Sequence, residues 1–308
     1  MHPTILNNLP GLILIEISRT VVSTCVAGIL FLLIGALAAK AAFARARGLD
    51  KFVALSTLCF AAPLAVFAAE HFSAARGISQ IVPKFMPWPL FWTYLVGVAL
   101  AAAACSIATR IQVCWSGLSF GVMMFLFVAM MDIPGALGDR HNRIAWTLLL
   151  RETSFGAGGW MVAAAAMNES LVQTRKVLVI IGRVIIGGAA IFYGVEHFLH
   201  PVNVPGVPLE KLMPTWIPGR PLVSYVTGAF LIIAGAEILF TKKTRMAATF
   251  LGSWIVLLVL FIYGPILITS LLTPGTDVKV EGINYFFDTL LYAGTVLALA
   301  SAAMRSLR

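Results

Sequence analysis

Apolar runs of about twenty residues recur along the whole chain and restrict its fold more than any other feature. A run of this length is what a helix needs to cross the hydrocarbon core of a bilayer. Inside lipid every backbone N–H and C=O group has to be paired within the protein, so only helices or a closed β-barrel can span it. Barrel strands alternate apolar and polar residues, whereas the runs here, for example 18–40 and 247–271, do not alternate. The sequence therefore predicts an all-α, polytopic transmembrane protein.

The composition is consistent with lipid as the solvent. Of the 308 residues, 60% are hydrophobic and 11% are charged, whereas soluble domains carry about 25% charged residues. The formal net charge is +9, but Lys and Arg lie mostly in the short connections between apolar runs, as in membrane proteins. No basic face with interleaved aromatic residues is visible. We therefore expect the lipid bilayer as the partner, and no nucleic acid.

Nine apolar runs are candidates for spanning helices. They cover 18–40, 52–72, 90–109, 112–131, 144–166, 177–199, 221–240, 247–271 and 284–303. The odd-numbered connections and the C-terminal tail are richer in Lys and Arg than the even-numbered ones, and loops rich in these residues stay in the cytoplasm. We therefore expect a multi-pass protein of the cell (inner) membrane with its N-terminus outside and its C-terminus in the cytoplasm.

A set of short motifs occurs twice in the same order. Each copy has a Glu-His pair at the end of its first helix, a Met-Pro in the next loop, a Tyr-x-x-Gly in the following helix and an acid-Thr pair in its last helix. The matching motifs are Glu70-His71 and Glu196-His197, Met86-Pro87 and Met213-Pro214, Tyr94 with Gly97 and Tyr225 with Gly228, and Glu152-Thr153 and Asp288-Thr289.

The order of these motifs predicts a tandem duplication of a four-helix unit. We expect an N-terminal segment with one extra helix (1–48), a first repeat (49–170) and a second repeat (171–308). Because each unit has an even number of helices, both copies enter the membrane in the same direction and the repeats are parallel.

The repeated unit resembles the DoxX family of small four-helix membrane proteins. The Glu-His, Met-Pro and Tyr-x-x-Gly motifs carry this resemblance, together with the run 227–237, which ends at Glu237. The first copy has no acid at the position that matches Glu237. The resemblance implies the helical membrane fold. It also implies one of two roles, because some members are subunits of thiosulfate:quinone oxidoreductases and others are accessory membrane proteins.

Ionisable residues gather near the expected outer ends of the helices. A charge inside a membrane costs about 2.5–3.5 kcal/mol, so such groups suggest function. The candidate catalytic residues are His71, Glu152, His197 and Asp288, and the candidate substrate-binding residues are Glu70, Arg151 and Glu196.

The histidines should find their partners on other helices. Adjacent residues on a helix point about 100° apart, so the Glu and His of one motif do not face each other. We expect the pairs His71–Glu152 and His197–Asp288. A histidine beside a carboxylate can relay protons near neutral pH, which quinone chemistry needs. The alternative is that the Glu-His motifs only cap helix ends and hold the units together.

Two further expectations concern ions and cofactors. Arg183 and Glu237 lie on consecutive helices near the expected cytoplasmic side and are expected to form a structural ion pair. No helix carries HxxxH or ExxH spacing, so we expect no metal site. No haem, flavin or dinucleotide motif is visible, so the expected cofactor is a quinone or belongs to a partner redox subunit.

Three functions fit these observations. The first is a membrane component of a quinone-linked or sulfur-compound redox system with an outward-facing His/carboxylate site. The second is a transporter for a small solute, which tandem repeats favour but the scarcity of polar residues near the expected bilayer midplane disfavours. The third is a non-catalytic accessory or assembly protein. All three stand at this point, and so does the question whether the chain is an enzyme.

Overall fold

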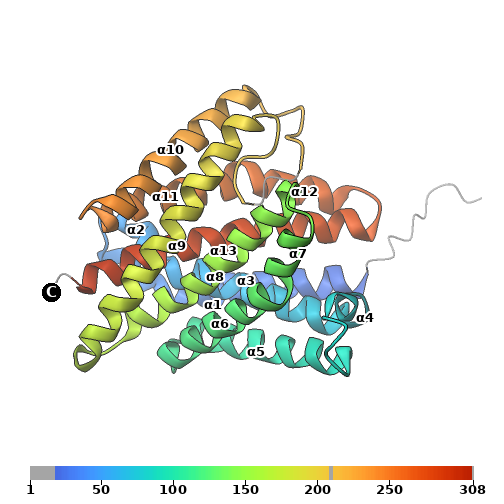
Figure 1. Cartoon of the computed structure of the whole chain (residues 1–308), viewed down its shortest axis with the longest axis horizontal. Helices are drawn as coiled ribbons and strands as arrows, with labels where there is room; N and C mark the ends of the chain where they lie inside the picture. Colours follow the sequence, from blue (N-terminus) through green and yellow to red (C-terminus); the bar gives the residue numbers. More distant parts are fainter. Residues whose placement is uncertain (1–17, 208–210, 307–308) are drawn as a thin grey trace, which may run out of the picture.

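The computed structural model describes residues 18–207 and 211–306, and this part of the chain is helical with no strand (Figure 1). Residues 1–17, which belong to the expected N-terminal segment, lie outside the described residues. The helices are α1 (Arg19–Arg45), α2 (Asp50–Ala54), α3 (Ser56–Ser73), α4 (Ala75–Ile78), α5 (Pro89–Thr109), α6 (Val113–Phe127), α7 (Ile133–Gly138), α8 (Arg143–Ala166), α9 (Val172–Leu199), α10 (Arg220–Phe240), α11 (Thr244–Leu258), α12 (Gly264–Leu272) and α13 (Thr276–Ser306).

All nine expected apolar runs are helical. Seven helical segments of the described chain are long and apolar enough to cross a membrane, or eight if α3 and the bent segment after it form one span. The seven are Arg19–Arg45, Pro89–Thr109, Val113–Gly138, Glu169–Leu199, Arg220–Phe240, Thr244–Leu272 and Thr276–Met304. Helix α8 is not among them, and it carries Arg151 and Glu152. The prediction of a helical chain with several helices of membrane-spanning length and apolarity is confirmed for the described residues, while the number nine and the repeat architecture stay predictions.

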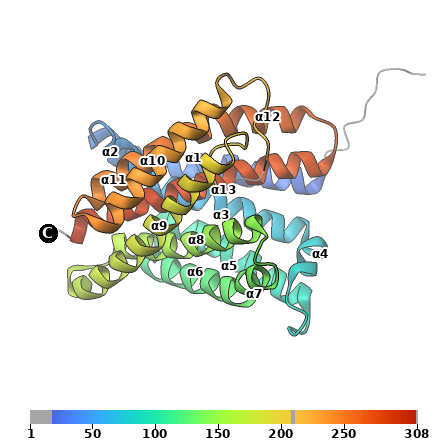
Figure 2. The same ribbon diagram turned by 45° about the horizontal axis from the view of Figure 1, so that its top comes forward.

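Helices α8 and α13 lie side by side at the centre of the molecule (Figures 1 and 2). Helix α13 also packs on α3 and α11, and α8 also packs on α6 and α9. In α13, 83% of the most apolar stretch is buried, compared with 22% in α1. One continuous core contains Phe60 and Leu64 from the first half of the chain and Ile186 and Tyr292 from the second. The two halves therefore pack into a single body.

Glycines bring several helix pairs into close contact. A Cβ atom on Gly117 of α6 would lie 2.5 Å from the carbonyl oxygen of Gly159 on α8. A Cβ atom on Gly194 of α9 would lie 2.8 Å from the carbonyl oxygen of Gly228 on α10. Small residues at such spacings let helices approach in lipid, where packing rather than hydrophobic burial drives their association.

In the described part of the chain, two helices contain a π-helical turn, and a proline follows each turn two residues later. The turn Val128–Asp132 joins α6 to α7 and precedes Pro134, and the turn Val259–Tyr263 joins α11 to α12 and precedes Pro265. Proline has no N–H for the helical ladder, and its ring crowds the preceding turn. A wider turn at this point relieves the crowding, and such turns occur often at functional sites.

Candidate functional site

An ion cluster of Arg151, Glu152 and Asp288 lies between the two central helices. The guanidinium of Arg151 donates from Nη2 to Oε1 of Glu152 over 2.9 Å and from Nη1 to Oδ2 of Asp288 over 3.0 Å. The exposed fractions of the three side chains are 14%, 22% and 15%. The sequence placed all three among the candidate site residues, but it did not pair Arg151 with either carboxylate. Two carboxylates and one guanidinium leave the cluster with a formal charge of −1.

A central cavity of about 330 Å³ adjoins the ion cluster. Its apolar walls come mainly from α3, α5, α6 and α8. Its polar lining residues are His71, Asp132, Arg151, Glu152, Asn284 and Asp288. The structure thus brings three of the four candidate catalytic residues to one cavity, and the fourth, His197, is not among its lining residues.

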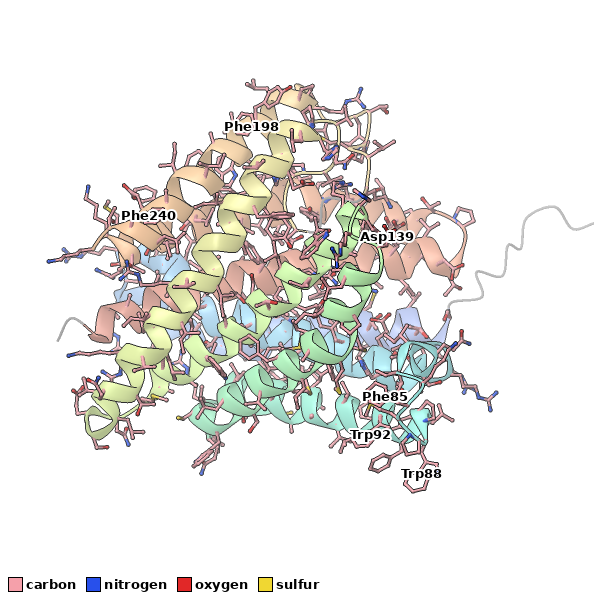
Figure 3. The ribbon with its side chains drawn as sticks, in the orientation of Figure 1. Phe85, Trp88, Trp92, Asp139, Phe198 and Phe240 are labelled. Carbon is pink, nitrogen blue, oxygen red and sulfur yellow. The ribbon has the colours of Figure 1, made fainter. Side chains whose placement is uncertain are left out.

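An apolar cavity of about 630 Å³ lies beside the central cavity. Its lining residues come from the segment 78–86, α5 and the α6 helix with its π-helical turn, and His71 is among its few polar members. Both cavities share His71, Ile81, Val96, Met123, Phe127 and Met131. Figure 3 shows Trp92, which lines the apolar cavity, near Phe85 and Trp88 where the chain enters α5.

The apolar cavity opens on the outer surface of the helix bundle. Its lining side chains Ile81, Trp115, Val122 and Leu126 are exposed by 51–69%. Exposed apolar side chains on a membrane helix face lipid, so a lipophilic molecule in the bilayer could reach His71 through this opening.

A polar cavity of about 500 Å³ also borders the ion cluster. It is lined by Glu70, Asp277, Glu281 and Asn284, and it shares Arg151, Asn284 and Asp288 with the central cavity. The polar cavity and the central cavity therefore adjoin each other at these three residues.

His71 has one ring nitrogen for a ligand. Its Nδ1 lies 2.7 Å from the carbonyl oxygen of Phe67, one turn earlier in α3. A carbonyl only accepts hydrogen bonds, so Nδ1 carries the proton and Nε2 of the neutral ring is an acceptor. Among the described residues, the expected hydrogen bond between His71 and Glu152 is not formed, because Glu152 bonds to Arg151. The two side chains instead line the same cavity.

His197 is sealed by the loop that follows α9. Its Nδ1 lies 2.6 Å from the carbonyl oxygen of Tyr193, and its Nε2 accepts a hydrogen bond of 3.0 Å from the backbone N–H of Gly206. The ring has no exposed surface. With both nitrogens engaged by backbone groups, His197 does not form the expected pair with Asp288. In this structure the imidazole of His197 is therefore not accessible to a ligand, as the expected catalytic role would require.

The two glutamates of the repeated motif have different partners. Glu70 accepts a hydrogen bond of 3.3 Å from Nδ2 of Asn284 and lines the polar cavity. Glu196 is buried and accepts a hydrogen bond of 3.2 Å from Nη1 of Arg143, the first residue of α8. A substrate-binding role stays a prediction for Glu70. Glu196 instead forms an ion pair that holds α9 to the start of α8.

The expected ion pair of Arg183 and Glu237 is wrong. Arg183 donates from Nε to the carbonyl oxygen of Ile238 over 2.8 Å, and from Nη2 to those of Leu239 and Thr241 over 3.2 and 2.7 Å. The last carbonyls of a helix lack intrahelical partners and carry negative partial charge. Arg183 on α9 therefore caps the C-terminus of α10.

Sequence reasoning missed two residues of the central cavity. Asn284 lies four residues before Asp288 on α13, so the helical period places both on one face. The second is Asp132, whose Oδ2 atom is buried at the cavity and has no hydrogen-bond partner among the described residues. An acid directly before Ile133-Pro134 inside an apolar run was the available signal.

No group of three or more His, Cys, Asp or Glu side chains that could hold a metal ion occurs in the ranges 18–207 and 211–306. Comparisons with protein-family models, with curated proteins and with solved structures give no match for this chain.

Proposed function

We propose that the chain is the membrane component of a quinone-linked redox system and binds the quinone at the central cavity. The observation that carries the proposal is the meeting of the two cavities at His71, where the apolar cavity that opens toward lipid adjoins the central cavity with its polar residues and ion cluster. A quinone has an apolar tail and a polar head, so it matches both spaces. The two volumes fall in the range of about 300–1,000 Å³ that is typical of small-molecule sites.

The redox step itself needs a donor outside this chain. Reduction of a quinone to a quinol takes up two electrons and two protons, and a partner redox protein would supply the electrons. The polar cavity offers the protons a route, because it is lined by the carboxylates Glu70, Asp277 and Glu281 and adjoins the central cavity at the ion cluster. In this scheme His71 binds the head group, and Arg151 holds Glu152 and Asp288 in place.

We also propose the tandem duplication and the DoxX-like membership that the motifs suggest. Two geometric parallels support the duplication. In each half the histidine Nδ1 is bonded to the carbonyl four residues earlier. The next aromatic residue stacks on a tyrosine of the following helix, Phe72 on Tyr94 at 6.3 Å and Phe198 on Tyr225 at 5.6 Å. The duplication, with α8 counted as a span, gives nine helices with the N-terminus outside the inner membrane.

The test is to purify the full chain with its lipid and to measure bound quinone after solvent extraction. We expect quinone in the wild-type protein and a loss of about tenfold in its affinity in His71→Ala, because the smaller side chain loses its apolar contacts with the ligand in the cavity. His141→Ala is the matched control, because His141 is exposed in the connection before α8.

Two results would contradict the proposal. The first is a wild-type protein that neither retains quinone nor binds it on titration. The second is equal binding by His71→Ala. Flux of a small solute into liposomes without any electron donor would favour the transporter instead. A protein with neither activity that is required for the assembly of a partner would favour the accessory role.

A further inference from the structure

In the second half of the chain, backbone groups of the loop that follows α9 occupy the site around His197 and Tyr263. The N–H of Gly206 donates to Nε2 of His197, and the hydroxyl of Tyr263 donates to the carbonyl oxygen of Pro205 over 3.1 Å. The neighbouring side chains Val204 and Val207 are buried. A peptide segment thus fills the position beside this histidine.

Under the proposed duplication, the first half has the same two positions without the loop. His71 corresponds to His197, and Asp132 corresponds to Tyr263, because each ends a π-helical turn two residues before a proline. His71 and Asp132 both line the central cavity, and Oδ2 of Asp132 has no hydrogen-bond partner among the described residues. An unpaired buried carboxylate oxygen is costly, so this position is suited to a ligand that supplies a donor.

The hydrogen-bonding character of the cavity selects the form of the ligand. Nε2 of neutral His71 is an acceptor, and so is the carboxylate of Asp132. Three of the five N–H groups of Arg151 are directed at Glu152 and Asp288. A quinol offers two hydroxyl donors, whereas a quinone offers only acceptors. The two acceptors, Nε2 of His71 and Oδ2 of Asp132, therefore complement the reduced ligand.

The net charge of the cavity lining disfavours anionic ligands. Three carboxylates (Asp132, Glu152 and Asp288) and one guanidinium (Arg151) give 1 − 3 = −2 with His71 neutral. Like charges at a binding site disfavour the wrong ligand. An anionic head group such as a fatty-acid carboxylate is thus repelled, although its chain would suit the apolar cavity.

We propose that the central cavity is specific for a quinol, with one hydroxyl donating to Nε2 of His71 and the other to Asp132, and that it rejects anionic lipids. This inference rests on the proposed quinone-linked function and adds to it the form of the ligand and a binding residue, Asp132.

The test uses the full chain in phosphatidylcholine nanodiscs under anaerobic conditions. A short-chain ubiquinol, the matching ubiquinone and oleate are titrated separately, and binding is read from the tryptophan fluorescence, since Trp92 and Trp115 line the apolar cavity. We expect the quinol to bind about tenfold more tightly than the quinone, and oleate to bind weakly.

Asp132→Asn should lower the quinol affinity about tenfold and raise the affinity for oleate. Asp139→Asn is the control, because Asp139 is exposed in the connection between α7 and α8 (Figure 3). The comparison of the three ligands on the wild-type protein needs no variant, so it stands even where Asp132→Asn does not fold.

The outcomes separate the two proposals. Binding of neither quinol nor quinone by the wild-type protein overturns the proposed function. Binding of both with equal affinity, tighter binding of the quinone, tight binding of oleate, or an unchanged quinol affinity in Asp132→Asn overturns the present inference alone.

Discussion

Nη1 of Arg151 on α8 lies 3.0 Å from Oδ2 of Asp288 on α13. This ion pair joins the two central helices, and its two residues come from different halves of the sequence. Because Arg151 also bonds to Glu152, its guanidinium is the group that neutralises two largely buried carboxylates. Removing one partner of a buried ion pair leaves an uncompensated charge, which costs about 3–5 kcal/mol.

Arg151→Met should therefore destabilise the protein by about 3–5 kcal/mol, because Glu152 and Asp288 lose their counter-charge. Thermal unfolding in a mild detergent measures the effect. The control is the triple variant Arg151→Met, Glu152→Gln, Asp288→Asn, which removes all three charges and should recover most of the loss. A melting temperature of Arg151→Met equal to that of the wild-type protein would show that the cluster does not stabilise the contact between α8 and α13.

Two variants distinguish the cap that Arg183 forms on α10 from the ion pair with Glu237 that the sequence suggested. Because Arg183 bonds to three carbonyl oxygens, Arg183→Met should destabilise the protein by about 1.5–3 kcal/mol, the usual range for a hydrogen bond to a charged group. Glu237→Gln should have little effect, since the ion pair with Arg183 is not formed. If Glu237→Gln were as destabilising as Arg183→Met in the same thermal measurement, the carboxylate rather than the carbonyls would be the partner.

The two histidines should differ in chemical reactivity. Diethyl pyrocarbonate modifies accessible imidazole nitrogens, and mass spectrometry of peptides locates the modification. We expect His71, which lines two cavities, to react, and His197, which has no exposed surface and two engaged nitrogens, to be protected.

Gly206→Ala should expose His197 to the same reagent. Gly206 has a φ of +139°, and a Cβ atom there would lie 2.6 Å from the hydroxyl oxygen of Tyr263. The added methyl group therefore displaces the loop that seals the histidine. Gly188→Ala is the control, because a Cβ atom on Gly188 meets no atom within 4 Å. Continued protection of His197 in Gly206→Ala would mean that residues other than the loop cover it.

The helices could be predicted from the sequence because the signal for each is local. Every apolar run became a helix, since a run of about twenty apolar residues in lipid has no other way to pair its backbone. The bend of 89° after Ser73 was not predicted. The apolar residues before Ser73 predict only a helix. The direction of the segment Ala75–Ile81 depends on packing rather than on a local motif.

Side-chain partners could be predicted only in part. The sequence singled out His71, Arg151, Glu152 and Asp288, and the structure gathers them around one cavity. Which of them bond to each other depends on the rotation of α8 against α13, and helical spacing does not contain that information. The sealing of His197 depends on a loop that folds inward, and its Pro-rich sequence gave no such signal.

The opening of the apolar cavity can be tested by closing it. Ala99 on α5 lines this cavity, whereas the neighbouring Val98, which is 56% exposed, does not. Ala99→Trp places an indole in the cavity and should reduce the affinity for a long-tailed quinol by at least about tenfold, because the tail loses its apolar contacts. The fluorescence titration in nanodiscs measures the affinity.

Val98→Trp adds the same side chain one position away, directed toward lipid, and should leave binding and the melting temperature unchanged. Equal loss of binding in both variants would point to a general effect of bulk on α5, and full binding in Ala99→Trp would mean that the ligand reaches His71 by another route.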